Sequence, residues 1–321
     1  MDDALIVAFL FDGEGHARPL DLDEVKAWTP AQGKLWAHFQ LDAPEAIAWL
    51  RKGAKLPHLV PEALLADETR PRTSVSGDGA IVVLRGVNLN PGEHAEDMVS
   101  VRMWVDEYRL ISTRRRKLLS IQDAVESLRE MPVTGTADLL LRIAGRLTDR
   151  MGDVIDDLED RVAGLEESVM DEPDLSVRSA LSGLRREAIA LRRYLAPQRE
   201  ALSRLQLEPP QCFNDMDRVR AREINDRLVR LIEDLDAVRE RASVVHEELV
   251  SRLSDEMNKR MYVLSIVAAL FLPLGFLTGL LGINVGGIPG AENPYSFWIF
   301  CGILVVLLTT QVWVFLVKKW F

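Results

Sequence analysis

Cysteine is scarce in this sequence, which has only Cys212 and Cys301 among its 321 residues. Cys301 lies inside an apolar run and Cys212 far ahead of it, so we expect no disulfide. The chain also lacks an excess of basic residues, because its net charge is −10. Nucleic-acid partners are therefore not expected, since they require a basic face. The acidity suits a protein that attracts cations, and equally a cytoplasmic domain that acidity keeps soluble.

Signatures of catalysis are missing as well. The sequence has no glycine-rich phosphate loop, no Gly-x-Ser-x-Gly and no Cys-x-x-Cys. Its histidines are scattered, and no two lie at the i, i+4 spacing of a helical metal site. A lone histidine is more often structural than a metal ligand. We therefore expect neither an enzyme nor a resident cofactor.

Charge is absent from the C-terminal part of the chain between Met261 and Ala291. Residues 261–281 are almost unbroken apolar, and residues 296–317 form a second uncharged run. A helix of about 20 residues spans roughly 30 Å, the thickness of a bilayer's hydrocarbon core. We predict two transmembrane helices here. The alternative is a hairpin buried in a soluble core, but soluble helices rarely stay uncharged on every face.

The flanks of the two runs predict their orientation. Basic pairs border the runs, with Lys259 and Arg260 before the first and Lys318 and Lys319 after the second. The joining segment, residues 282–295, carries the single charged residue Glu292. Basic flanks stay in the cytoplasm, so residues 282–295 should be an external loop and residues 318–321 a cytoplasmic tail. The N-terminus has no basic n-region of a signal peptide and should also be cytoplasmic.

Ahead of the membrane, residues 1–130 are predicted to form a cytoplasmic α/β domain. Strands are expected at residues 4–11, 34–41, 72–76, 80–88, 98–105 and 109–113, and helices at residues 44–52, 61–68 and 120–129. Gly77-Asp78-Gly79 favours a tight hairpin turn. The pattern is typical of a sheet covered by helices. A basic cluster at residues 114–117 could meet acidic lipid or an acidic neighbour, although a solvated turn is favoured.

The middle of the chain is helical. Residues 131–214 are predicted to form a cytoplasmic helical hairpin, and residues 215–260 a stalk helix with a heptad seam. The seam consists of Ile224, Leu228, Leu231, Leu235, Val238, Ala242, Val245 and Leu249. No helix breaker lies between Asp215 and Tyr262, so the stalk should continue into the first span. We expect the preceding helices and further copies of the same chain to cover this seam.

A ring of first spans could enclose a water-filled path, which one two-span chain cannot. One face of this span carries small, weakly polar or flexible residues at helical spacing, namely Asn258, Met261, Ser265, Ala268, Leu272 and Gly279. None is ionisable, so a passing ion would keep much of its water. At the outer end, Gly282, Ile283 and Asn284 leave the helix, and a ring of Asn284 carboxamides could select a hydrated divalent cation. Equally, Gly282 could be a C-cap and Asn284 a turn residue.

These residues resemble a known family. Asn258-x-x-Met261-x-x-Leu264-Ser265, then residues 271–274 (Phe-Leu-Pro-Leu) and 279–284 (Gly-Leu-Leu-Gly-Ile-Asn), are similar to the CorA superfamily of divalent-cation transporters. That family usually has Gly-Met-Asn where this chain has Gly-Ile-Asn. With the glycine-rich residues 286–290 that follow, the variant resembles the ZntB-type zinc transporter branch.

The resemblance implies a CorA-like homopentamer in the inner membrane, with an α+β cytoplasmic domain, a long stalk helix and two C-terminal transmembrane helices. The first span would line the pore, Gly282, Ile283 and Asn284 would form the selectivity filter, and Asn258 and Met261 would form inner constrictions. Zinc would be the substrate, with cadmium, nickel and cobalt as further candidates. The alternative is a CorA-type magnesium or cobalt transporter, and a third hypothesis is a membrane-tethered coiled-coil scaffold that carries no ion.

The chemistry of the predicted pore does not by itself indicate zinc. Zinc favours Cys, His and carboxylate ligands, and this pore has none, so zinc would pass hydrated. Protons are a candidate coupled ion, but no intramembrane residue could carry them. Outside the membrane, His246, Glu247 and Asp255 on the stalk are a candidate regulatory metal site. The alternative interpretation, the solvated flank of a heptad helix, is favoured.

Overall fold

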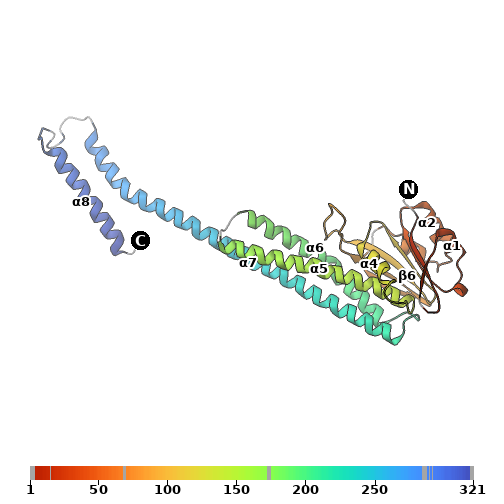
Figure 1. Ribbon diagram of the computed structural model, residues 1–321. Helices are drawn as coiled ribbons and strands as arrows, with labels where there is room; N and C mark the ends of the chain where they lie inside the picture. Colours follow the sequence, from red (N-terminus) through yellow and green to blue (C-terminus); the bar gives the residue numbers. More distant parts are fainter. Residues whose placement is uncertain are drawn as a thin grey trace. The chain divides into compact units, whose positions relative to one another are not determined.

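The strands and helices of the protein follow the sequence order labelled in Figure 1. The strands are β1 (Leu5–Phe11), β2 (Ala17–Pro19), β3 (Lys34–Gln40), β4 (Arg72–Ser76), β5 (Gly79–Gly86), β6 (Val99–Val105) and β7 (Arg109–Arg114). The helices are α1 (Leu22–Ala27), η1 (Pro30–Gln32), α2 (Pro44–Ala48), the π-helical turn η2 (Trp49–Gly53), α3 (Val60–Leu65), α4 (Leu119–Ser127), α5 (Thr136–Asp171), α6 (Leu175–Leu207), α7 (Asp215–Gly282) and α8 (Ser296–Val317).

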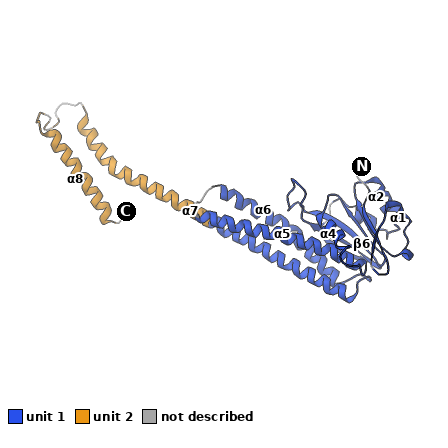
Figure 2. Ribbon diagram, viewed as in Figure 1, with its two compact units in different colours: residues 1–247 blue, residues 248–321 orange. Residues whose placement is uncertain are grey.

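The computed structural model describes residues 4–14, 16–67, 70–171, 175–283, 288, 290 and 292–318. The chain divides into two compact units, residues 1–247 and residues 248–321, coloured separately in Figure 2. Helix α7 contributes to both units. We describe each unit by itself.

The first unit is built on a seven-stranded sheet with the order β2-β1-β3-β7-β6-β5-β4. Its strand pairs are antiparallel except for β3 and β7, which run parallel. The β4–β5 hairpin turns where the sequence predicts it, with Ser76 paired to Gly79 and Gly77 at a φ of 59°. A left-handed φ costs glycine little, which explains the residue at this position.

Helices cover both faces of this sheet, as the sequence predicts. One face packs against α2, η2 and α3 through a core that includes Phe39, Leu50, Leu64 and Trp104. The other face packs against α5 and α6. Fully burying a side chain of this kind stabilises the fold by about 1.5–3 kcal/mol. The sheet between two helical layers therefore forms the main core of the unit.

Two elements of this unit were missed by the sequence interpretation. Strand β2 is only three residues of Ala-Arg-Pro, and it forms by pairing with the edge of β1. Helix α1 carries a capping box, in which Asp21 accepts from the Glu24 amide and Glu24 accepts from the Asp21 amide. That Asp-x-x-Glu spacing was a readable signal for the start of a helix. In addition, the helix expected over residues 44–52 changes to a π turn at Trp49.

His38 supports the view that a lone histidine in this chain is structural. It is fully buried in β3, and its Nδ1 lies 2.8 Å from the Ser112 hydroxyl on β7. Its Nε2 has no hydrogen-bond partner within the described part of the chain. Burial, together with the nearby Arg114 charge, lowers the pKa of His38 to about 3. The imidazole therefore stays neutral in the folded protein at physiological pH.

This histidine should make the protein less stable in mild acid. The unfolded chain binds a proton at His38 below about pH 6.5, whereas the folded chain does so only near its lowered pKa. Stability should therefore fall between these pH values by up to about 1.4 kcal/mol per pH unit, relative to a His38→Asn variant that cannot titrate. Thermal unfolding of both proteins at pH 7.0 and pH 5.5 measures this difference. Parallel losses in the two proteins would contradict the assignment.

Helices α5, α6 and the first part of α7 run side by side in the first unit (Figure 1). Ion pairs tie α7 to α5 at Arg220–Asp138 and Arg241–Glu166, and to α6 at Asp236–Arg192. Every residue of the heptad seam, from Ile224 to Leu249, is buried within the single chain. The expectation that further copies cover part of this seam is therefore wrong, because α5 and α6 already do so.

The second unit consists of the end of α7 and of α8. Helix α7 continues through the predicted first span to Gly282 without a break, and α8 begins and ends where the second span is predicted. Both helices are long and apolar enough to cross a membrane, and no described residue of these apolar stretches is buried. Tyr262, Tyr295, Trp298 and Trp313 are all exposed on these helices or beside them. An apolar surface of this kind must be covered by lipid or by other chains.

Candidate functional site

The predicted pore face lies on the continuous helix α7. Its six positions, Asn258, Met261, Ser265, Ala268, Leu272 and Gly279, are all exposed in the single chain. At about 100° per residue they fall within one narrow side of the helix. By contrast, Ile266, Pro273 and Leu277, on the opposite side, are only partly exposed. The predicted face is therefore the more open side of this span.

The polar groups on and near this face are weak ligands. The Ser265 hydroxyl donates to the Met261 carbonyl at 2.8 Å, and the Thr278 hydroxyl donates to the Leu274 carbonyl at 3.0 Å. Each donor is thus used inside the helix, which leaves only hydroxyl lone pairs for a passing ion. Such a surface can contact the water around a cation but cannot replace that water with charged ligands.

The end of α7 carries the predicted selectivity filter. Gly282 is the last residue of the helix, and the described residues with left-handed φ include Gly33, Gly77 and Gly290 but not Gly282. The alternative of a left-handed C-cap at Gly282 is therefore not what the structure shows. Ile283 is exposed, and Asn284 lies outside the described residues. A Cβ added at Gly279 or Gly282 would meet no atom within 4 Å in this chain, so packing inside one chain does not require these glycines.

The candidate regulatory site is not assembled within one chain. His246 and Asp255 are separated by a helix rise of about 13 Å. Among the residues that the structure describes, no group of three or more His, Cys, Asp or Glu side chains could hold a metal ion. Glu248 and Glu256 beside them pair with Arg252 and Arg260. His246, Glu247 and Asp255 remain a prediction for a site shared between copies.

Comparison with known proteins places these features in a family. The family model for the CorA-like Mg2+ transporter protein matches residues 31–319. The chain belongs to the CorA family. The chain is 38% identical over 316 residues to a zinc transport protein ZntB of Yersinia pestis, covering 98% of this chain and 95% of that protein. It is 40% identical over 320 residues to the divalent cation transporter CmaX of Pseudomonas aeruginosa, covering 98% and 96%.

Solved structures support the same fold. The full-length CmaX structure superposes with a TM-score of 0.84 at 38% identity, covering 100% of this chain and 99% of that one. The CorA magnesium transporter of Methanocaldococcus jannaschii superposes with a TM-score of 0.83 at 20% identity, covering 98% and 99%. The CorA-like fold expected from the sequence, a helix-covered sheet with one long helix and an apolar C-terminal helix, is confirmed.

One electrostatic feature of this CorA-family chain was missed in the sequence. Glu159 on α5 has its pKa raised by burial and by the carboxylates of Asp156, Asp160 and, from α7, Asp234. An acidic run was readable at residues 156–160, but its approach to α7 depends on helix packing. Negative charge gathered in this way raises the local concentration of cations.

Proposed function

We propose that this protein transports divalent cations, zinc first among them, across the cell's inner membrane through a homopentameric pore. The observation that carries this proposal is helix α7, which leads from the folded first unit through an uncharged span to Gly282-Ile283-Asn284. The relatives of highest value for the substrate are ZntB and CmaX, each matched over 98% of this chain. Zinc and other divalent cations are the substrates that their names state.

Assembly is needed because the span cannot form a pore alone. One pair of helices exposes its apolar surface on all sides, and none of its described span residues is buried. In a ring of five chains, the outward surface would meet lipid and the face from Asn258 to Gly279 would line water. Gly279 and Gly282 have free space around them in the single chain, which would admit a neighbouring backbone. Residues 261–281 would then be the pore helix and residues 296–317 its lipid-facing partner.

Selection in such a pore acts on a hydrated ion. Zinc bound tightly in proteins is held by Cys, His or carboxylate groups, and a site of that strength would release the ion slowly. A carboxamide ring at Asn284 instead hydrogen-bonds to the water around the ion, which allows both entry and exit. Acidic helices on the cytoplasmic side, which residues 1–260 form in this proposal, would attract cations. Both termini would lie in the cytoplasm, because basic residues flank both spans.

Flux measurements test the substrate. The full-length protein is reconstituted in liposomes that contain a zinc-sensitive dye, and we expect dye response only in vesicles with protein. Magnesium and cobalt uptake are measured in parallel, since the family description names Mg2+. Strong magnesium flux without zinc flux would favour the magnesium transporter, and no flux of any ion would favour the scaffold. Repeating the assay across a pH gradient shows whether protons are coupled.

A further inference from the structure

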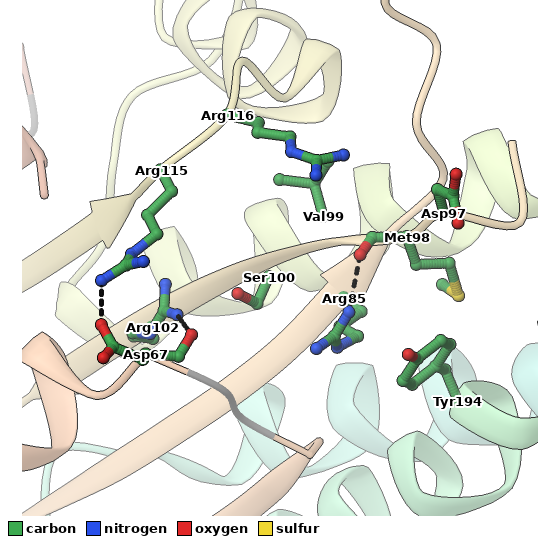
Figure 3. A pocket seen from close by; sticks show the side chains of 10 residues that line it. All are labelled: Asp67, Arg85, Asp97, Met98, Val99, Ser100, Arg102, Arg115, Arg116 and Tyr194. Carbon is green, nitrogen blue, oxygen red and sulfur yellow. Dashed lines mark hydrogen bonds and ion pairs between the residues drawn. The ribbon is translucent and has the colours of Figure 1, made fainter. Parts of the chain in front are cut away.

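A pocket unrelated to the permeation path lies in the first unit, at one end of the sheet (Figure 3). Its volume is about 280 Å³, close to the lower end of the roughly 300–1,000 Å³ of small-molecule sites. It is lined by Asp67, Arg85, Asp97, Met98, Val99, Ser100, Arg102, Arg115, Arg116 and Tyr194. Four arginines and two aspartates leave a formal positive excess here, in a chain whose net charge is −10.

The most unusual of these residues is Arg102. On β6 it pairs with Val83 and Thr113 of the neighbouring strands, in the same register as Trp104 of the core. Its side chain is consequently buried, with only 1% exposed. The guanidinium Nη2 donates to the Asp67 carbonyl at 3.1 Å, whereas Nε and Nη1 find no acceptor within the described part of the chain.

A buried guanidinium without a counter-charge is costly, and such a group calls for an explanation in the form of a missing ion or ligand. Burial and the charges of Arg115 and Arg85 lower the pKa of Arg102 to about 10, so the group remains positive at neutral pH. The carboxylate of Asp67 pairs with Arg115 instead. The charge of Arg102 is therefore balanced only in part by the described residues around it.

The other arginines are held in place around the pocket. Arg85 donates to the Met98 carbonyl at 2.7 Å, and its guanidinium lies 4.2 Å from the centre of the Tyr194 ring. Arg116 pairs with Glu93 at 3.4 Å. Figure 3 shows Ser100 between the group of Arg102, Arg115 and Asp67 and the group of Arg85 and Tyr194. Residues held in this way lose little freedom when they bind a ligand.

We propose that this pocket binds a phosphate group, either as inorganic phosphate or as a phosphate monoester. Arginine matches the oxygens of phosphate in geometry and charge, and several arginines around one pocket provide more donors than one carboxylate can accept. An anion here would supply the counter-charge that Arg102 lacks. The basic cluster at residues 114–117, for which a solvated turn was favoured, contributes Arg115 and Arg116 to this site. The proposal is independent of the transported ion.

Phosphate-dependent stability of the full-length protein in detergent tests this site. Thermal unfolding is measured in sodium phosphate and in sodium chloride of equal ionic strength, and we expect phosphate to raise the midpoint by roughly 5 °C. Isothermal titration with inorganic phosphate gives the affinity directly. Arg102→Met keeps the length and apolar part of the side chain but removes the charge. It should bind phosphate about tenfold more weakly or worse, while Arg199→Met, at an exposed position on α6, binds like wild type.

Further outcomes decide the matter. Equal stabilisation by chloride and phosphate, or wild-type affinity in Arg102→Met, would overturn the proposal. So would the absence of phosphate binding to the assembled protein, as expected if a carboxylate of another copy fills the pocket. If Arg102→Met does not fold, Arg115→Met decides in the same way, because Arg115 is partly exposed and less important to the core. Titration with AMP then distinguishes the sources: tighter binding than that of phosphate indicates a nucleotide monoester, and weaker binding indicates free phosphate.

Discussion

Replacing Asn284 with alanine should abolish selective zinc uptake while the oligomer remains intact. The expected loss of zinc flux is roughly tenfold or more, the factor that corresponds to about 1.4 kcal/mol at a selective step. In the proposed pore, five carboxamides at Asn284 contact the water around the ion, and alanine provides no hydrogen-bonding group there. Because the residue follows the end of α7, its loss should not affect the first unit.

A matched control is available in the same external segment. Asn293 is also an asparagine, but its carboxamide oxygen accepts from the Tyr295 amide at 3.0 Å and so serves the local turn. Asn293→Ala should retain zinc flux, so that only the position of the lost carboxamide distinguishes the variants. Flux is measured with the zinc-sensitive dye, and the mass of the detergent-solubilised protein is measured by light scattering. Unchanged transport in Asn284→Ala would rule out the selectivity ring, and a monomeric wild type would remove the pore.

The second large effect is expected at Asp138, where α5 begins. Its carboxylate is buried and accepts from the Thr134 amide at 3.1 Å, from Arg142 at 2.9 Å and from Arg220 of α7 at 2.6 Å. Asp138→Ala leaves these donors without their shared acceptor. Removing one member of a buried ion pair costs about 3–5 kcal/mol, which for a domain of this size lowers the unfolding midpoint by roughly 10 °C.

The pH dependence gives this prediction a second signature. Burial alone would raise the pKa of Asp138, but hydrogen bonds from Arg142 and Thr134 and the charge of Arg220 hold it below its ordinary value of 3.8. A carboxyl whose pKa is lower in the folded state stabilises the protein above its unfolded pKa. That contribution is lost as the pH falls through the folded pKa. The deficit of Asp138→Ala should therefore be largest at neutral pH and shrink below about pH 4.

Asp149→Ala is the control for this experiment. Asp149 also lies on α5 and pairs with Arg227 of α7, but both side chains are exposed by more than a third. Exposed pairs contribute only about 0–1 kcal/mol, so its unfolding midpoint should stay near that of wild type. Thermal unfolding of both variants, followed by tryptophan fluorescence between pH 7 and pH 3.5, provides the comparison. Equal midpoints for the two variants would contradict the role of Asp138.

Much of the fold could be predicted from local patterns. The β4–β5 hairpin, the strand β3 and the continuity of α7 into the first span were expected, and the bounds of α8 coincide with the predicted second span. Turn residues, alternation and the absence of breakers act over a few neighbours, so the sequence displays them directly. Helix α1 was missed although its capping box was readable, and β2 was missed because its pairing with β1 is its only support.

The candidate pore was predictable for the same reason and only to the same extent. Helical spacing places Asn258, Met261 and Gly279 on one side of α7, and resemblance suggested the role of Gly282-Ile283-Asn284. The regulatory role of His246 could not be settled in this way, because a metal site requires ligands from separate elements or copies. Likewise, the heptad seam showed that α7 needs partners, but not that α5 and α6 of the same chain provide them.

The sequence by itself determined the two apolar helices, their basic flanks and the family. A membrane span must satisfy its backbone hydrogen bonds internally and be apolar along its length, and both are properties of a continuous segment. Only the tertiary structure decided that Arg102 is a buried cation and that Arg85, Arg115 and Tyr194 meet around it. Strand register and helix packing bring together residues from distant parts of the chain, so no local pattern reveals the charge that they enclose.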